Sequence, residues 1–259
     1  MAKTYDKEKV INHKKKAIRT LNNLLEKYIA ETTPDSLKKA DLISYWLESY
    51  TNYIDFETTF DSSRLPRYKR GSVLRVNFGF NIGKELGGLH LAVVLDNDNK
   101  RNADVITVIP LSSTDGKAVH PRNVDLQTEV YTTIHSHLLA MSDEIKARNT
   151  YLKNLADQHY KLIHTGLTPQ QVAELEPIVI QTNEEIKEVD ASLDILQKHI
   201  EEITHMKRGS MALVNQITTI SKQRIYIPKK SSDFLYGITL SEEAMDKINA
   251  KIKELYFFE

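Results

Sequence analysis

The feature that most constrains the fold is a long apolar repeat with a period of seven residues. It begins at Leu138 and, after the turn-like stretch TGLTP, resumes and continues to Ile203, with interruptions at Arg148 and His159. A seven-residue repeat on both sides of a turn is typical of two helices that pack as an antiparallel coiled coil. We therefore predict a helical hairpin over residues 134–206, with arms of roughly 40 Å at about 1.5 Å per residue.

Apolar residues also fall at helical spacing between residues 5 and 60. The stretch TTPDS divides this part, because Pro34 suits the first turn of a helix and Thr33 or Asp35 can cap one. We expect two helices here, followed by a polar linker, DSSRLPRYKR. In the second arm of the hairpin, Pro177 predicts a kink or a fresh helix start.

From Gly71 the apolar pattern changes to the period of β-strands. GSVLRVNFGF alternates, LHLAVVL is a buried run, and DVITVIPLSS is a second run that Pro110 is expected to end. The strand-like VDLQTEVYTTI precedes the hairpin, and SMALVNQITTI and RIYIP follow it. About five or six short strands favour a small β-barrel. The C-terminal stretch SEEAMDKINAKIKELYFF predicts a helix that Ser241 caps.

The fold class is therefore α+β: a small barrel with an N-terminal helical extension and an inserted antiparallel coiled-coil hairpin. The predicted domains are a helical extension over residues 1–68, a barrel domain assembled from 69–133 and 207–259, and the helical insertion over 134–206.

Charge and composition exclude several classes of protein. Lys and Arg total 35, as do Asp and Glu, so no overall basicity indicates a polyanionic partner. Residues 1–70 hold 14 Lys and Arg against 10 Asp and Glu, whereas residues 134–206 hold 6 against 12. The absence of cysteine excludes disulfides and thiolate metal sites. Because no stretch reaches the roughly 18 apolar residues of a membrane span and no apolar leader opens the sequence, we expect a cytoplasmic protein without a membrane partner.

Polar and flexible residues gather around His90, in the loop between two predicted strands. This loop holds Asn81, Gly83, Lys84, Glu85, Gly87 and Gly88. The next strand closes with three hydroxyl side chains in a row, in the stretch LSST. Because loops of adjacent strands meet at one rim of a barrel, we expect these groups to lie together.

Four motifs in this order resemble the MazF/PemK family of toxin endoribonucleases from bacterial and phage toxin–antitoxin modules. They are KRGSVLRVNFG, GKELGGLHLAVVLDND, VITVIPLSS and ALVNQITTISKQRI. The family repeats a Gly-x-Val strand start, a Gly-x-Glu loop before a Val-Val-Leu strand, a strand ending Pro-Leu-Thr-Ser, and an Asn-Gln or Glu-Gln strand ending Ile-x-Thr-Ile. The resemblance covers residues 69–133 and 207–227 and does not extend to residues 1–68 or the helical hairpin.

The resemblance implies an SH3-like barrel that forms a homodimer, cleaves single-stranded RNA such as mRNA without a metal or cofactor, and is neutralised by a cognate antitoxin. In such cleavage the ribose 2′-hydroxyl attacks the phosphodiester, which leaves a 2′,3′-cyclic phosphate and a 5′-hydroxyl. The protein takes a proton from the 2′-oxygen, gives one to the leaving 5′-oxygen, and stabilises charge on the phosphorus oxygens. DNA lacks this nucleophile.

The sequence departs from the family at the expected catalytic positions. Many members carry Arg-Pro before the Val-Val strand, whereas this chain has His90-Leu91, and Ser112 stands where threonine is common. A histidine with a pKa of about 6.5 can both accept and donate a proton near neutrality. We assign His90 as general base or acid, Ser112 as hydroxyl donor to a phosphate oxygen, and Glu85 as a third catalytic candidate.

The remaining candidates are expected to bind RNA. Lys84 would hold the phosphate, and Gly87 and Gly88 would let the backbone approach a nucleotide closely. The other predicted RNA-binding residues are Asn81, Ser113, Asn215, Gln216 and Thr218. Each has a structural alternative: a histidine entering a buried strand is commonly structural, paired glycines form turns, Glu85 can hydrogen-bond its own loop, and the polar residues of the last motif can pair across the sheet.

No metal site is expected, because His135 and His137 have ligand-like spacing but no third and fourth ligands in sequence reach. The alternative function is a catalytically inactive RNA- or protein-binding module on the same barrel, and a third class is a scaffold that works through the helical hairpin. The N-terminal helices could guide RNA, pack on the acidic hairpin, cover the RNA groove as a built-in inhibitor, or simply be solvated.

Overall fold

The structure is a computed structural model of the 259-residue chain, and it describes residues 5–114, 116 and 118–258. The chain divides into two compact units. One contains the N-terminal part up to Phe60 together with Asn77–Leu89, and the other contains Asp61–Val76 together with the chain from His90 onward. The three-domain division read from the sequence stays a prediction.

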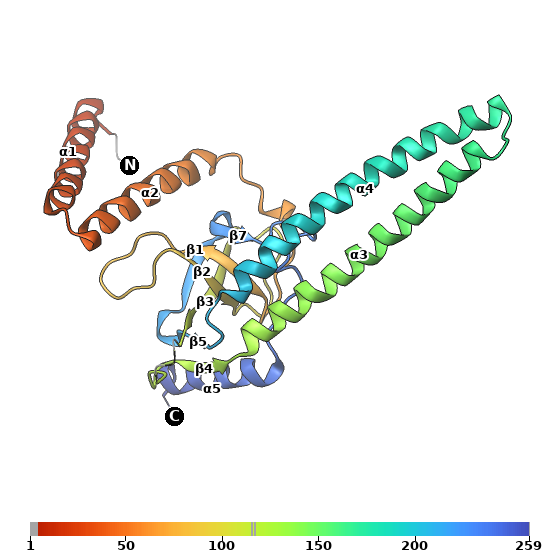
Figure 1. Cartoon of the computed structure of the whole chain (residues 1–259). Coiled ribbons are helices and arrows are strands. Elements are labelled where there is room, and N and C mark those ends of the chain that lie inside the picture. Colours follow the sequence, from red (N-terminus) through yellow and green to blue (C-terminus); the bar gives the residue numbers. More distant parts are fainter. Residues whose placement is uncertain (1–4, 115, 117, 259) are drawn as a thin grey trace. The chain divides into compact units, whose positions relative to one another are not determined.

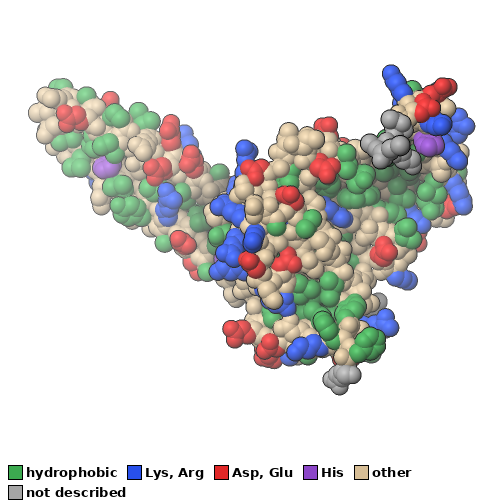
Figure 2. Space-filling model, turned by 180° about the vertical axis from the view of Figure 1, so that it is seen from behind, with side chains coloured by type: hydrophobic (Ala, Val, Ile, Leu, Met, Phe, Trp, Pro, Cys, Tyr) green, Lys and Arg blue, Asp and Glu red, His purple; other side chains and the backbone are tan. Residues whose placement is uncertain are grey.

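Two helices lie in the first unit, α1 (Lys7–Glu31) and α2 (Pro34–Phe56) (Figure 1). Thr33 caps α2 through reciprocal hydrogen bonds with Ser36, and Pro34 occupies the first turn. The predicted break between the helices is confirmed, with Thr33 as the cap. Lys and Arg side chains gather on this part of the molecule, and the run Lys14–Lys16 is exposed (Figure 2).

The described residues form a seven-stranded sheet with the order β4-β5-β3-β2-β1-β7, in which β6 also pairs with β3. The strands are β1 (Val73–Asn77), β2 (Leu89–Val94), β3 (Val105–Ser113), β4 (Val124–Gln127), β5 (Ser210–Ala212), β6 (Thr218–Ser221) and β7 (Ile225–Ile227). The α+β class with an antiparallel sheet is confirmed. Because no pairing among the described residues joins the end strands β4 and β7, the SH3-like barrel stays a prediction.

Strand β3 changes its neighbour along one edge. It pairs with β6 over 105–108 and with β5 over 111–113, while β2 pairs with its other edge. Pro110 lies between these two ladders, and its carbonyl accepts a hydrogen bond from the Leu213 N–H at 2.9 Å. The missing proline N–H therefore removes no ladder bond. The prediction that Pro110 ends this strand is wrong for that reason.

Two stretches predicted as strands are partly helical. In VDLQTEVYTTI, β4 ends at Gln127 and α3 (Glu129–His164) begins two residues later. The first turns of α3 bury Val130 and Ile134, which lie on one face of a helix. In SMALVNQITTI, a short 3₁₀ helix, η2 (Val214–Gln216), separates β5 from β6. A second 3₁₀ helix, η3 (Lys222–Arg224), joins β6 to β7.

Helices α3 and α4 (Pro169–Thr204) form the insertion and run side by side beyond the sheet (Figure 1). Each has 36 residues, which corresponds to about 54 Å at 1.5 Å per residue. They exceed the predicted length because α3 already begins at Glu129 and α4 continues through Pro177, so the predicted fresh helix start is wrong.

Buried side chains of the insertion recur every seven residues. In α4 they are Thr182, Val189, Leu196 and Ile203. This spacing is what a coiled coil requires. The supercoil itself stays a prediction. Across the two helices, the Asn149 side-chain amide donates to the Asp190 carboxylate at 2.5 Å.

The predicted linker DSSRLPRYKR is part of the second unit. It contains the short 3₁₀ helix η1 (Ser62–Arg64), and the side chains of Leu65 and Tyr68 are 8% and 2% exposed. The Tyr68 hydroxyl donates to the Pro228 carbonyl at 2.7 Å. The segment is therefore part of the core of this unit.

The C-terminal helix α5 (Glu242–Tyr256) starts at the predicted cap, because the Ser241 hydroxyl accepts a hydrogen bond from the Ala244 N–H. Its buried face, the base of α3 and one face of the sheet share a single core, which includes Val73, Val93, Ile109, Ile134, Leu138 and Ile248. None of the helices in the described part of the chain is long and apolar enough to cross a membrane.

Tyr68→Phe is expected to lower the free energy of unfolding by about 1 kcal/mol, because it removes the donor to a buried carbonyl and leaves the packing of the ring unchanged. Urea titration measures this change. Tyr151→Phe, which alters a ring that is 66% exposed on the arm, serves as the matched control and should leave stability unchanged.

The same variant should alter the alkaline stability profile. Burial, reinforced by the Asp233 carboxylate, raises the pKa of Tyr68 above its ordinary value of 10.0. Above pH 10 the unfolded state loses a proton that the folded state keeps, so stability falls as pH rises. The decline should be smaller in Tyr68→Phe; an identical decline in both proteins contradicts this account.

Candidate active site

Two of the three residues predicted to carry the chemistry, His90 and Ser112, lie on the adjacent strands β2 and β3. The register pairs Ala92 with Pro110 and Val94 with Val108. His90 and Ser112 each lie two residues beyond the last pair of this ladder, Ala92 and Pro110, and both residues belong to their strands. On its other edge, Ser112 pairs with Met211 of β5. That the two side chains act together on one phosphate group stays a prediction.

His90 and Ser112 lie where a buried face of the sheet becomes accessible. With a two-residue period they share this face with Ala92 and Pro110, which are buried. His90 and Ser112 are themselves half-buried. A group at such an end is held by the strand and is still reachable from solvent.

The loop before β2 belongs to the first unit and is shaped by its own polar side chains. The Asn81 amide donates to the Leu86 carbonyl at 2.6 Å. The Glu85 carboxylate accepts a hydrogen bond from the Ile82 N–H at 3.4 Å, and Glu85 itself is exposed. Asn81 and Glu85 thus stabilise the loop, which was the structural alternative for Glu85. Lys84 is exposed near the tip of the loop.

Two glycines close the base of this loop. The Gly88 N–H donates to the Gly79 carbonyl at 2.6 Å, and Gly88 has a φ of +87°. A β-carbon on Gly87 would lie 2.6 Å from the same carbonyl oxygen, so the close approach of the two segments requires glycine there. The structure gives these glycines a backbone-packing role, and their expected approach to a nucleotide stays a prediction.

The structure does not bring the other predicted RNA-binding residues together at this point. Ser113 lies beside Ser112 on β3 and pairs with Ser210. Thr218 pairs with Val108, four residues earlier on β3 than Ser112. Asn215 and Gln216 lie on η2, and Asn215 is exposed.

His135 and His137 lie at the start of the arm, on α3. The Tyr131 ring stacks on His135 with centroids 5.5 Å apart. Within the part of the chain that the structure describes, no group of three or more His, Cys, Asp or Glu side chains is arranged to hold a metal ion. His135 and His137 are thus not part of such a group.

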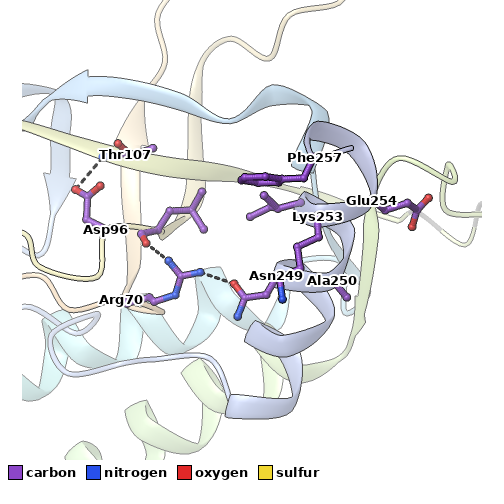
Figure 3. Close-up of a pocket in the computed structure, with 10 residues that line it drawn as sticks. Arg70, Asp96, Thr107, Asn249, Ala250, Lys253, Glu254 and Phe257 are labelled. Carbon is purple, nitrogen blue, oxygen red and sulfur yellow. Dashed lines mark hydrogen bonds between the residues drawn. The ribbon is translucent and has the colours of Figure 1, made fainter. Parts of the chain in front are cut away.

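A pocket of about 1140 Å³ lies at the opposite end of the β2–β3 pair (Figure 3). Its lining includes Leu95, Asp96, Thr107 and Phe257. The Arg70 guanidinium donates to the Leu95 carbonyl and to the Asn249 side chain, and the Asp96 carboxylate accepts from the Thr107 N–H at 3.1 Å. These polar groups are partnered within the chain and connect α5 to the sheet. Sequence reasoning gave no signal for this pocket.

The chain was compared with known protein families. The family described as the PemK-like, MazF-like toxin of type II toxin-antitoxin systems matches residues 69–170. Residues 69–170 are thus similar to that family, which confirms the resemblance seen in the sequence. The match includes the first three motifs and ends before the fourth, which lies beyond the arm. No curated protein matched the chain.

Gly87→Ala is expected to weaken the base of the loop, because the added methyl group forces the two backbone segments apart. Hydrogen exchange at the Gly88 amide should become faster. Gly83→Ala is the control: Gly83 has a φ of +65° with nothing within 4 Å of its β-carbon position, so that variant costs about 1–2 kcal/mol in local strain without disturbing the Gly88 bond. Equal exchange at Gly88 in Gly87→Ala and the parent protein contradicts the packing role.

Proposed function

We propose that the protein is a metal-independent endoribonuclease toxin that cleaves single-stranded RNA such as mRNA by attack of the ribose 2′-hydroxyl. The observation that supports this function best is that His90 and Ser112 are half-buried residues on the neighbouring strands β2 and β3, each two residues beyond the pair of Ala92 and Pro110. The match of residues 69–170 to a toxin family also supports this function.

In the proposed reaction, the 2′-oxygen forms a bond to phosphorus while the bond from phosphorus to the 5′-oxygen breaks. His90 accepts the proton of the attacking hydroxyl or donates the proton that the leaving oxygen requires. The Ser112 hydroxyl donates to a non-bridging phosphate oxygen, where negative charge increases in the transition state. Lys84 binds the phosphate, and Glu85 is the candidate for the second proton transfer.

The proposed partners follow from the same family. They are single-stranded RNA, a cognate antitoxin that neutralises the toxin, and a second copy of the chain in a homodimer of SH3-like barrels in the cytoplasm. Asn81, Gly87, Gly88, Ser113, Asn215, Gln216 and Thr218 are the proposed RNA-binding residues in addition to Lys84.

His90→Ala is expected to reduce the rate of RNA cleavage by about 10²–10⁴-fold, the usual effect of removing a positioned acid or base. The assay follows a long single-stranded RNA in EDTA and identifies 2′,3′-cyclic phosphate ends on the products. Ser112→Ala should also slow cleavage, because one donor to the developing charge is lost.

His164→Ala is the matched control, since His164 is exposed near the end of α3 and should leave cleavage unchanged. His90→Arg separates the two possible contributions of His90: arginine keeps a positive charge but cannot accept a proton near neutrality. Restored activity in His90→Arg identifies charge stabilisation as the role of this position. If the parent protein binds RNA but leaves it intact, this result rejects the endoribonuclease hypothesis and favours the inactive binding module.

A further inference from the structure

The first unit joins helix α2 to the loop between β1 and β2, and a single indole ring makes the contact. Trp46 is the only tryptophan of the chain and is half-buried on α2. A β-carbon on Gly79 would lie 2.6–2.7 Å from three carbon atoms of this ring. The backbone of Gly79 therefore packs directly on the indole, at a distance that no side chain on residue 79 permits.

Two tyrosines of α2 support this contact. The rings of Tyr50 and Tyr53 lie 5.8 Å and 6.2 Å from the Trp46 ring, centroid to centroid. Tyr53 also touches the loop, because its hydroxyl accepts a hydrogen bond from the Asn77 side-chain amide at 3.4 Å. Helix α2 thus presents an aromatic cluster to the first residues of the loop, Asn77 and Gly79.

Gly79 connects the aromatic cluster to the end of the loop through its backbone hydrogen bonds. Its N–H donates to the Asn77 side chain at 3.0 Å, and its carbonyl accepts from the Gly88 N–H at 2.6 Å. The Phe78 N–H completes the closure by donating to the Gly88 carbonyl at 2.8 Å. Gly88 precedes His90 by two residues in the chain. The residue on which Trp46 packs therefore binds both ends of the loop.

The contact holds the base of the loop and leaves its tip accessible. Ile82 is 85% exposed, and Lys84 and Glu85 are exposed as well. A helix that covered the loop would bury these side chains. Within this unit, the aromatic cluster is arranged to fix the loop in place rather than to cover its tip.

We propose that Trp46 is a positioning residue: through Gly79 it fixes the loop between β1 and β2 in the conformation that binds single-stranded RNA. This inference rests on the proposed function, because it makes the loop part of the RNA site. It assigns the N-terminal helical extension a role in substrate binding that is exerted through the loop, for which neither the family motifs nor the catalytic candidates account.

The test compares the full-length parent protein with Trp46→Ala, Trp46→Phe and Tyr45→Ala. Tyr45 is the neighbouring aromatic residue on α2 and is 71% exposed, so its truncation is the matched control. Hydrogen exchange reports the closure of the loop at the Phe78 and Gly88 amides. Cleavage of a single-stranded RNA in EDTA gives KM and kcat for each variant.

In Trp46→Ala, exchange at these two amides should become about tenfold faster, which corresponds to ~1.4 kcal/mol of local opening free energy. The KM for RNA should rise to the extent that the closed, binding-competent fraction of the loop falls, with kcat much less affected. A variant that merely folds less well lowers the amount of active enzyme and leaves KM unchanged. Trp46→Phe should recover part of both losses, and Tyr45→Ala should match the parent protein.

A double-mutant cycle with Gly79→Ala tests the contact without any substrate. In the parent protein, the methyl group of Ala at position 79 would clash with the indole of Trp46. In the Trp46→Ala protein, the same methyl group enters the space that the indole has left. Gly79→Ala should therefore destabilise the Trp46→Ala protein less than the parent protein. Additive effects, or unchanged exchange at Phe78 and Gly88 in Trp46→Ala, overturn the inference. A parent protein that leaves RNA intact overturns the proposed function, and the exchange and cycle measurements still decide whether Trp46 fixes the loop.

Discussion

The backbone hydrogen bonding of β3 is the constraint on which the rest of the sheet depends. One edge of this strand pairs with β2, and the other pairs first with β6 and then with β5. Five of its nine residues are buried, so unpaired N–H or C=O groups there would be costly. The break between β6 and β5 falls at the only position on β3 that has no N–H to satisfy, Pro110. The same strand ends at Ser112 and Ser113, which pair with Met211 and Ser210 of β5.

The loop between β1 and β2 shows how packing and proposed function use the same residues. Gly87 is required by the close approach to Gly79, and Gly88 has a positive φ that favours glycine, whatever the loop binds. Asn81 and Glu85 are hydrogen-bonded within the loop and still lie in the segment expected to contact RNA. A rigid, self-stabilised loop loses little entropy on binding, so these structural roles favour a binding role as well.

Much of this architecture is predictable from the sequence, because the signals are local. The cap at Thr33, the cap at Ser241 and the seven-residue repeat of the arm each act within a few turns of helix. The placement of His90 and Ser112 on neighbouring strands needs only the strand order. What could not be predicted depends on partners distant in sequence. The neighbour change at Pro110, the burial of Tyr68 under Pro228, and the contact between Trp46 and Gly79 are of this kind.

The point at which the arm leaves the sheet bears on how such a chain can vary. The strands on either side of the insertion pair with each other, Val124 opposite Ala212, so the chain returns to where it left. The pairing of β4 with β5 therefore does not depend on how many residues lie between the two strands in the chain. The packing of α3 on α4 does depend on the lengths of the two helices, because Asn149 of α3 must lie beside Asp190 of α4 to form their hydrogen bond. If both helices gain or lose one heptad at once, the arm becomes longer or shorter by ~10 Å and the sheet does not change. Relatives of this protein can thus differ in the length of the arm by such steps.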